Sequence, residues 1–123
     1  MKILNCTPHD VNRYLPTDVD DPKTRKPQLK SADIKPTETF PKSDTVATAD
    51  ICTIGSGYDY EYIYKNVTDL PEGYDIYIVS MPYALACKAL GRDTSRLRTL
   101  HKGVSAYGDD TYRTIGTLGL VKV

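Results

Sequence analysis

The chain has 123 residues, and its sixteen basic side chains match its sixteen acidic ones, so no net positive charge gathers nucleic acid. This length fits one domain over residues 1–123, because two halves would each be too small to bury a stable core. Hydrophobic residues make up 40% of the chain, and no apolar run approaches the ~20 residues of a membrane-spanning helix. The start of the chain has no signal-like apolar stretch, which predicts an intracellular protein that does not enter a membrane.

The three cysteines, Cys6, Cys52 and Cys87, are odd in number and widely spaced. This arrangement predicts buried thiols rather than a disulfide framework. No CxxC pair indicates zinc, the acidic residues are scattered, and the motifs of phosphate-binding loops, dinucleotide folds and zinc proteases are absent. We therefore expect neither a metal ion nor a cofactor.

Two strands are predicted near the N-terminus, over residues 2–6 and 10–15, with a short turn between them in which Pro8 fixes φ. The next stretch, about 16–43, contains five prolines and shows little periodicity. We predict a long irregular loop there, which is either functional or an insertion.

A hairpin is predicted in the middle of the chain. Residues 45–54 are rich in β-branched side chains, residues 58–67 alternate tyrosine with other residues, and Gly55-Ser56-Gly57 separates the two runs. The tyrosines at positions 58, 60, 62 and 64 share one strand face, which is typical of a stacking platform for a base. Simple packing with wet hydroxyls is the commoner role of such a face. Tyr62 represents this face among our candidate ligand-binding residues.

A strand over residues 74–79 leads directly into a helix over about 81–90, which Ser80 caps and Gly91 ends. A helix N-terminus presents unpaired N–H groups and a partial positive charge, so this junction is a candidate anion site. Pro82 removes one of these donors, and serine caps helices whether or not a ligand is bound.

Residues 104–107 and 112–123 predict a closing hairpin around Gly108-Asp109-Asp110. The chain then contains about seven strands and one helix. This content predicts an α+β fold, in which a mostly antiparallel, curled sheet packs on one main helix.

Polar side chains follow two of the predicted strands. Asn5 and Thr7 come at the end of the first strand, His9 lies in the turn, and Ser80 follows the strand 74–79. We expect the two strands to be neighbours in one sheet, so that these four side chains share one pocket. The imidazole of His9 changes charge near neutral pH, which suits phosphate contact or acid–base work, although an exposed turn histidine is often idle. Asn5 and Thr7 either supply donors to the pocket or brace the turn through its own backbone.

A basic run follows the helix, from Lys88 to Lys102, with Asp93 as its one acidic residue. Arg92 is the first choice for holding a phosphate, because a guanidinium grips an oxyanion by two parallel hydrogen bonds. The alternative is that Arg92 pairs with Asp93 or a helix carbonyl and only supports the fold. His101, in what we predict to be a basic loop, is a weaker candidate.

Several short motifs follow one another along the chain: Asn5-Cys6-Thr7-Pro8-His9-Asp10-Val11, Pro41-Lys42-Ser43 with Val46-Ala47, Ile76-Tyr77-Ile78-Val79-Ser80, Gly91-Arg92-Asp93, Ile115-Gly116 and Gly119-Leu120. This order resembles a widespread group of small phage and prophage proteins that begin with "NLTPH" and share a "YIVS" strand and a closing "RDxxGxxxG" hairpin. The chain departs from the group at Cys6, where the group has Leu, and at Thr48, where an arginine usually follows Val-Ala. It departs again at Tyr107-Gly108-Asp109, where Arg-Asp is expected.

The resemblance implies a phage-encoded accessory protein that works in the host bacterial cytoplasm. It implies anti-defence activity, in which the protein binds and sequesters a nucleotide-derived immune signal such as a cyclic nucleotide or an ADP-ribose derivative. Two alternatives stay open: a metal-independent phosphodiesterase with His9 as acid and base, and a protein that binds and inhibits a host defence enzyme. Proteins that sequester such signals commonly assemble so that pockets form between subunits, so a homo-oligomer is also open.

Overall fold

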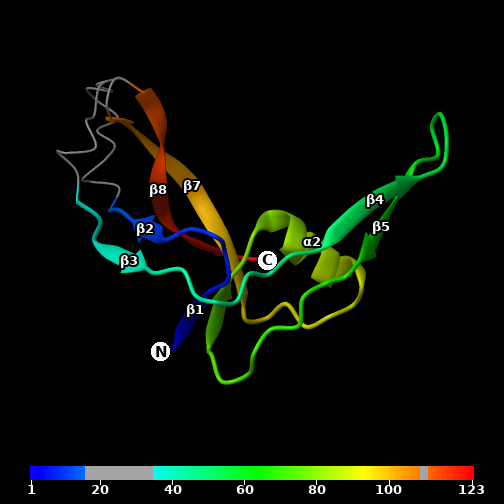
Figure 1. Ribbon diagram of the computed structural model, residues 1–123, viewed down its shortest axis with the longest axis horizontal. Coiled ribbons are helices and arrows are strands. Elements are labelled where there is room, and N and C mark those ends of the chain that lie inside the picture. Colours follow the sequence, from blue (N-terminus) through cyan, green and yellow to red (C-terminus); the bar gives the residue numbers. More distant parts are fainter. Residues whose placement is uncertain (16–34, 109–110) are drawn as a thin grey trace.

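The computed structural model describes residues 1–15, 35–108 and 111–123. These parts of the chain form a six-stranded sheet, a separate two-stranded sheet and one helix (Figure 1). In chain order the elements are β1 (Ile3–Asn5), β2 (Val11–Arg13), β3 (Glu38–Phe40), β4 (Asp50–Ile54), β5 (Glu61–Lys65), β6 (Ile76–Ile78), α2 (Met81–Ala89), β7 (Leu97–Gly108) and β8 (Thr111–Lys122).

The strand order of the large sheet is β1-β6-β7-β8-β2-β3. The pairs β1–β6, β6–β7 and β2–β8 are parallel, whereas β7–β8 and β2–β3 are antiparallel. The α+β class is confirmed, but the expectation of a mostly antiparallel sheet is only partly right, because the sheet is mixed. The reason is the α2 crossover, which returns the chain to the same edge and so makes β6 and β7 parallel.

The sheet curls until its two outer strands almost meet. Asn5 at the end of β1 forms a parallel bridge with Lys42, just beyond β3. Ser43 then donates its backbone N–H to the Asn5 carbonyl at 3.3 Å and its hydroxyl to the same oxygen at 2.7 Å. The predicted curled sheet is therefore confirmed, and it is nearly closed.

The strand β6 lies at the centre of the packing and is buried on both faces. Tyr77 and the adjoining Val79 face α2, where they pack with Tyr83, Ala84 and Cys87 of the helix. Ile78 points the other way, into the curl of the sheet, and packs with Val11 and Phe40. Successive side chains of a strand alternate between faces, so this short strand joins the two layers of the core.

Close approach of β2 and β8 requires a glycine at position 116. A Cβ atom there would overlap the carbonyl oxygen of Asn12 and the ring of Tyr14, which is 3% exposed and packs with Val104. The neighbouring Gly119 has open space around the same position.

Local sequence patterns misplace two strands. Residues 38–40 lie within the predicted irregular loop but form β3, because antiparallel pairing with β2 provides their hydrogen bonds. Residues 101–103, predicted as a basic loop, lie within β7, which begins at Leu97 and runs between β6 and β8. Residues 16–34 of the predicted loop, and Asp109 and Asp110 of the predicted closing turn, lie outside the described residues.

The predicted central hairpin is confirmed as β4 and β5, which pair antiparallel from Asp50↔Lys65 to Ile54↔Glu61. Gly55 and Gly57 of its connection have positive φ angles of 115° and 62°. Figure 1 shows that this hairpin projects away from the curled sheet. We call residues 50–65 the arm and the rest of the described chain the body.

Candidate functional site

The carboxyl ends of two parallel strands, β1 and β6, lie side by side at one edge of the body. β1 pairs with β6 in the register Ile3↔Ile76 to Asn5↔Ile78, and the Cys6 N–H continues the pairing to the Ile78 carbonyl at 2.8 Å. On the other side of β6, the Val79 N–H bonds to the Arg98 carbonyl of β7 at 2.9 Å. The expectation that strands 2–6 and 74–79 are neighbours is confirmed. The turn after β1 and the start of α2 therefore emerge at the same edge.

Asn5 builds the turn after β1. Its side-chain amide donates to the His9 carbonyl at 2.8 Å and to the Phe40 carbonyl at 2.9 Å. Its Oδ1 accepts from the backbone N–H of Thr7 at 3.0 Å and from the Thr7 hydroxyl at 2.6 Å. Asn5 is 2% exposed, and both of its amide hydrogens are engaged. Of the two roles that we considered, bracing the turn is the one that the geometry shows.

His9 combines a fixed backbone with an exposed side chain. Its carbonyl oxygen is held by the Asn5 amide and lies 3.0 Å from the Thr7 hydroxyl. The residue itself is exposed at the tip of the turn. The imidazole is thus presented to solvent from a backbone that is fixed by neighbouring side chains.

Ser80 caps α2 and remains exposed. Its Oγ accepts from the Tyr83 N–H at 3.4 Å, which is a long hydrogen bond that leaves the hydroxyl hydrogen free to donate elsewhere. The first turn of α2 contains no acidic residue, so no side chain of that turn offsets the partial positive charge of the helix N-terminus.

Lys42 is a basic residue of this edge that our sequence reasoning did not select. Its backbone is bridged to Asn5, and its N–H donates to Oδ1 of Asp10 at 2.8 Å. Both residues are exposed. Local patterns assign Lys42 to an irregular loop, and only the motif Pro41-Lys42-Ser43 of the resemblance marks its position.

Arg92 and Tyr62 lie elsewhere. Arg92 follows the C-terminal end of α2, and nine helical residues separate Ser80 from that end, a rise of about 13 Å. Its Nη1 pairs with Oδ1 of Asp69 at 3.1 Å in an exposed ion pair, so its guanidinium pairs with neither Asp93 nor a helix carbonyl, while its backbone N–H donates to the Cys87 carbonyl of α2 at 2.9 Å. Tyr62 lies on the arm, where it is 69% exposed. His101, expected in a loop, is an exposed residue of β7.

Thr99 is a polar residue of the core that sequence reasoning missed. It comes two positions after Leu97 in β7 and so shares the face of the sheet that α2 covers. It is 2% exposed, and among the described residues its Oγ1 is the buried side-chain oxygen without a hydrogen-bond partner. A single threonine in an alternating strand carries no sequence signal of this kind.

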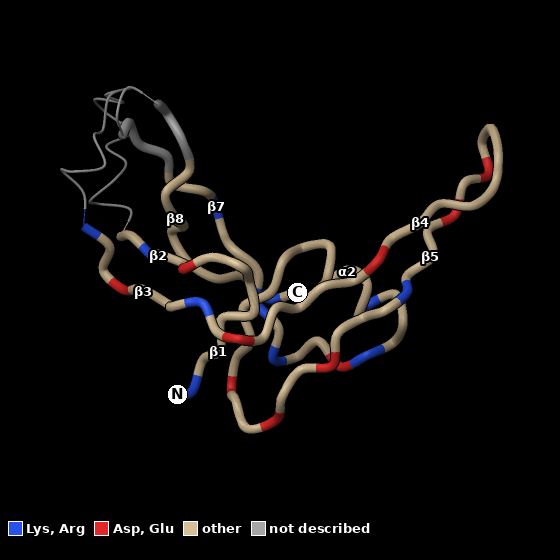
Figure 2. Tube along the Cα trace, in the orientation of Figure 1, with Lys and Arg blue, Asp and Glu red and all other residues tan. Residues whose placement is uncertain are grey.

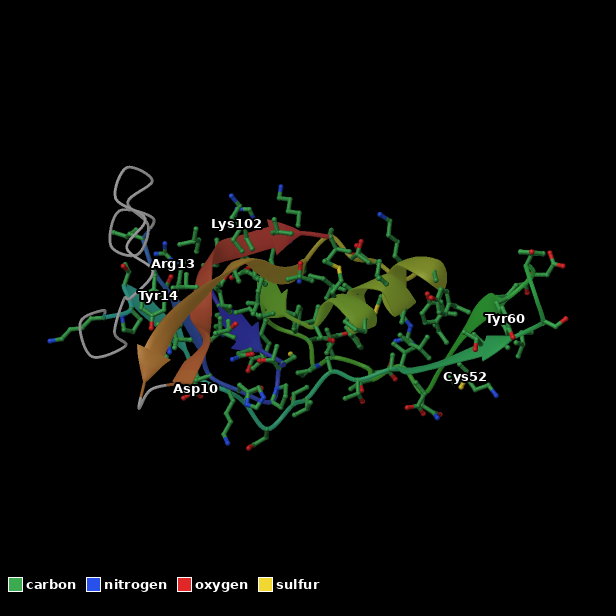
Figure 3. All side chains as sticks on the ribbon, turned by 90° about the horizontal axis from the view of Figure 1, so that it is seen from above. Asp10, Arg13, Tyr14, Cys52, Tyr60 and Lys102 are labelled. Carbon is green, nitrogen blue, oxygen red and sulfur yellow. The ribbon has the colours of Figure 1, made fainter. Side chains whose placement is uncertain are left out.

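The thiols fall into two groups. Cys6 and Cys87 are buried in the core beside α2, as predicted, and burial raises the pKa of the Cys6 thiol to about 11. Cys52 is exposed, so the prediction of a buried thiol is wrong there. The reason is that Cys52 lies on the arm, where no other element covers the strand (Figure 3).

Within the described residues, no group of three or more His, Cys, Asp or Glu side chains is placed to hold a metal ion. No helix in the described ranges combines the length and the hydropathy of a membrane-spanning segment. Comparison with protein-family models, with curated proteins and with solved structures gives no significant match.

Proposed function

We propose that the protein binds a phosphorylated small molecule of the nucleotide type at the carboxyl edge of β1 and β6, and that it holds this ligand intact. The observation that carries the proposal is the parallel pairing of these strands, which brings the His9 turn and the N-terminus of α2 to one edge. Ligands of sheets with parallel strands commonly bind beyond the carboxyl ends of those strands.

The electrostatics of this edge favour an anion. The helix start contributes partial positive charge and the Ser80 hydroxyl, and Lys42 adds a full positive charge close to β1. Asp10 also lies at this edge, where its Oδ1 accepts the Lys42 backbone N–H at 2.8 Å. Since that carboxylate is already hydrogen-bonded, it positions the Lys42 segment.

The turn is organised before any ligand arrives. The four hydrogen bonds of Asn5 fix the path of the chain from Thr7 to His9 and tie it to Phe40. A site that is already ordered avoids the entropy cost of ordering on binding. The resemblance to small phage proteins supplies the biological setting: sequestration of a nucleotide-derived immune signal, a cyclic nucleotide or an ADP-ribose derivative, in the host bacterial cytoplasm.

A metal-independent phosphodiesterase is the second candidate. It is favoured by His9, whose imidazole is exposed while its backbone is fixed, as a general acid or base requires. Such an activity would survive EDTA, because no bound metal would take part in it.

The test is incubation of the protein with a panel of cyclic nucleotides and ADP-ribose derivatives, followed by removal of free ligand, denaturation and chromatography. We expect intact ligand to be released on denaturation. Altered ligand in either the free or the protein-bound fraction would establish cleavage, and a ligand that is neither retained nor altered would contradict both functions.

Variants locate the site. Lys42→Ala should weaken binding by roughly tenfold to a hundredfold, since a charge-assisted hydrogen bond contributes about 1.5–3 kcal/mol. Lys88→Ala, at the last turn of α2, is the matched control and should leave affinity unchanged. Equal losses from both substitutions would indicate a general charge effect and would contradict a site at this edge.

A further inference from the structure

The arm exposes apolar side chains on both of its faces. Residues paired across an antiparallel ladder share a face, so Ile51, Thr53, Tyr62 and Tyr64 form one side of the arm. Cys52, Ile54 and Ile63 lie on the other side, flanked by charged residues. Every residue of β4 is exposed, and in β5 only Ile63 and Tyr64 are partly covered. Figure 3 shows Cys52 and Tyr60 on this projection, at the opposite end of the molecule from Arg13 and Tyr14.

The root of the arm, in contrast, is firmly attached to the body. Thr68 and Thr48 are joined by a backbone hydrogen bond of 3.0 Å, and the Tyr83 hydroxyl of α2 donates to the Thr68 carbonyl at 2.5 Å. Ala47 and Val67 pack in the core cluster beside α2. The arm therefore projects from a fixed base, and its exposure is a property of the fold rather than of a loose end.

An isolated two-stranded hairpin of this length is marginal in water, and a long apolar edge strand is a template for further pairing. Within the described residues, β4 and β5 pair only with each other, so the outer edge of each strand is unpaired. Exposed apolar residues on both faces, next to a free edge, are typical of an interaction surface.

The sequence of β5 matches itself in the antiparallel direction. It reads Glu-Tyr-Ile-Tyr-Lys from Glu61 to Lys65. When two such strands are placed antiparallel about Ile63, Glu61 of each copy faces Lys65 of the other, and Tyr62 of each faces Tyr64. Opposite charges and aromatic pairs are the cross-strand neighbours that stabilise a sheet. Centring on Ile63 is also the symmetric arrangement that pairs all five residues of the strand.

We propose that the arm is a dimerisation element, in which β5 pairs antiparallel with β5 of a second copy about a two-fold axis at Ile63. The two hairpins then form one four-stranded sheet in the order β4-β5-β5-β4. Tyr62 and Tyr64 of both copies gather on one face of this sheet, and the two Ile63 side chains meet on the other. The outer edge of β5, which is unpaired in the monomer, gains main-chain hydrogen-bond partners in each copy. This inference is independent of the ligand site at the carboxyl edge of β1 and β6.

The other edge of the arm fits a second copy less well. Antiparallel pairing of β4 with itself about Cys52 would place Asp50 opposite Ile54, which provides no partner for the charge. It would also leave Glu61 without a basic cross-strand partner, whereas Lys65 already faces Asp50 within the arm. Figure 2 shows acidic positions along the arm, and the one charged residue of β4 is Asp50, which would face no basic residue in such a pairing.

A charge exchange tests the proposal in solution. Glu61→Lys and Lys65→Glu are made separately in an Asp50→Asn background, because Asp50 is the cross-strand neighbour of residue 65 within the same arm. Each variant alone places like charges at both ends of the β5–β5 interface, and its self-association should weaken by about tenfold relative to the Asp50→Asn protein. A mixture of the two restores both attractive pairs and should form heterodimers, as measured by sedimentation equilibrium over a wide concentration range.

A cross-link fixes the register. In a Cys52→Ser background, Ile63→Cys should give a disulfide-linked dimer under mild oxidation, because the two-fold axis brings residue 63 opposite itself. Thr53→Cys is the matched control on β4, where the two copies would be about 14 Å apart, and it should not cross-link. An Asp50→Asn protein that stays monomeric at all concentrations would overturn the proposal and assign the arm to a different partner. Cross-linking of wild-type protein through Cys52 would also overturn it, in favour of pairing through β4.

Discussion

The chain contains two antiparallel hairpins with similar local patterns and different surroundings. β7 and β8 run for twelve residues each and lie within the large sheet, where Val104 and Thr117 are buried. β4 and β5 run for five residues each, and neither contains a buried residue. Alternation of side chains thus predicts that a segment is extended but not what will cover it. The first hairpin is part of the body, and the second is exposed for contact with another molecule.

This difference separates residues that stabilise the folded monomer from residues that are available to contact another molecule. Residues of the body have buried partners in β1, β6 and α2, so their removal leaves cavities or unpaired polar groups. Residues of the arm have solvent on both faces, so their removal costs the folded monomer little. The following substitutions test that division with matched variants and controls.

Asn5→Ala should cause the largest loss, a fall in the free energy of unfolding of about 3 kcal/mol. The substitution leaves the Phe40 carbonyl and the Thr7 N–H without their partner, leaves the Thr7 hydroxyl as the remaining side-chain donor to the His9 carbonyl, and weakens the seam between β1 and β3. Urea unfolding followed by circular dichroism measures the change.

The matched control is Asn66→Gly at the root of the arm. Asn66 has a φ of 52°, which glycine adopts freely, and its side chain bonds to Asp50 at an exposed site. We expect a change below about 0.5 kcal/mol. A loss from Asn66→Gly as large as that from Asn5→Ala would break the division between body and arm.

Gly116→Ala should destabilise the body by about 1–3 kcal/mol, because the new methyl group overlaps the Asn12 carbonyl and the Tyr14 ring. Gly119→Ala, three residues along the same strand, meets nothing within 4 Å and should be close to neutral. Thermal unfolding of the two variants side by side measures the difference. Equal melting temperatures would show that β2 and β8 are not packed as described.

Removal of a tyrosine hydroxyl should have a smaller effect, and only in the body. Tyr83→Phe loses the bond to the Thr68 carbonyl at a residue that is 2% exposed, so we expect a loss of about 1 kcal/mol. Tyr62→Phe, on the exposed face of the arm, should leave the unfolding free energy unchanged. A measurable loss from Tyr62→Phe in dilute protein would show that the arm is covered within the monomer.

Thiol labelling sharpens the comparison without perturbing the fold. Cys52 should react with a maleimide or an aromatic disulfide in the native state, whereas Cys6 and Cys87 should react only after unfolding. Mass spectrometry of the labelled peptides assigns each site. Native labelling of Cys6 as fast as that of Cys52 would contradict the packing beside α2.

The buried Cys6 thiol predicts that the free energy of unfolding depends on pH. Burial raises the pKa of Cys6 from 9.0 to about 11, so between these values the unfolded chain releases a proton that the native protein keeps. Cys6 therefore makes the free energy of unfolding fall as the pH rises from about 9 to 11. A Cys6→Ala variant should lose this contribution to the slope, although cavity formation lowers its stability at every pH.

Local signals in the sequence identify the elements better than their partners. Ser80 and Gly91 mark the two ends of α2, and the glycines at 55 and 57 mark the connection of the arm, because caps and turns depend on neighbouring residues. The placement of β3 depends on pairing with β2, and the ion pair of Arg92 with Asp69 joins residues 23 positions apart. No pattern within a short window encodes such pairs.

The candidate site shows the same limit. The pairing of the two strands that precede the β1 turn and Ser80 was predictable, since both are apolar strands that suit one sheet. The internal use of the Asn5 side chain was only one of two open alternatives, and the position of Lys42 beside it depends on closure of the sheet. Exposure of the arm was not predictable either, because an alternating strand gives the same pattern whether one face is covered or not.

Hydrogen exchange, read by mass spectrometry at low and high protein concentration, tests the division between body and arm most directly. The account predicts that amides of β1 and β6 are protected at both concentrations, whereas those of β5 exchange rapidly in dilute protein and become protected as the concentration rises. Protection of β5 that is strong in dilute protein and independent of concentration, or exchange of β1 before β5, would contradict it.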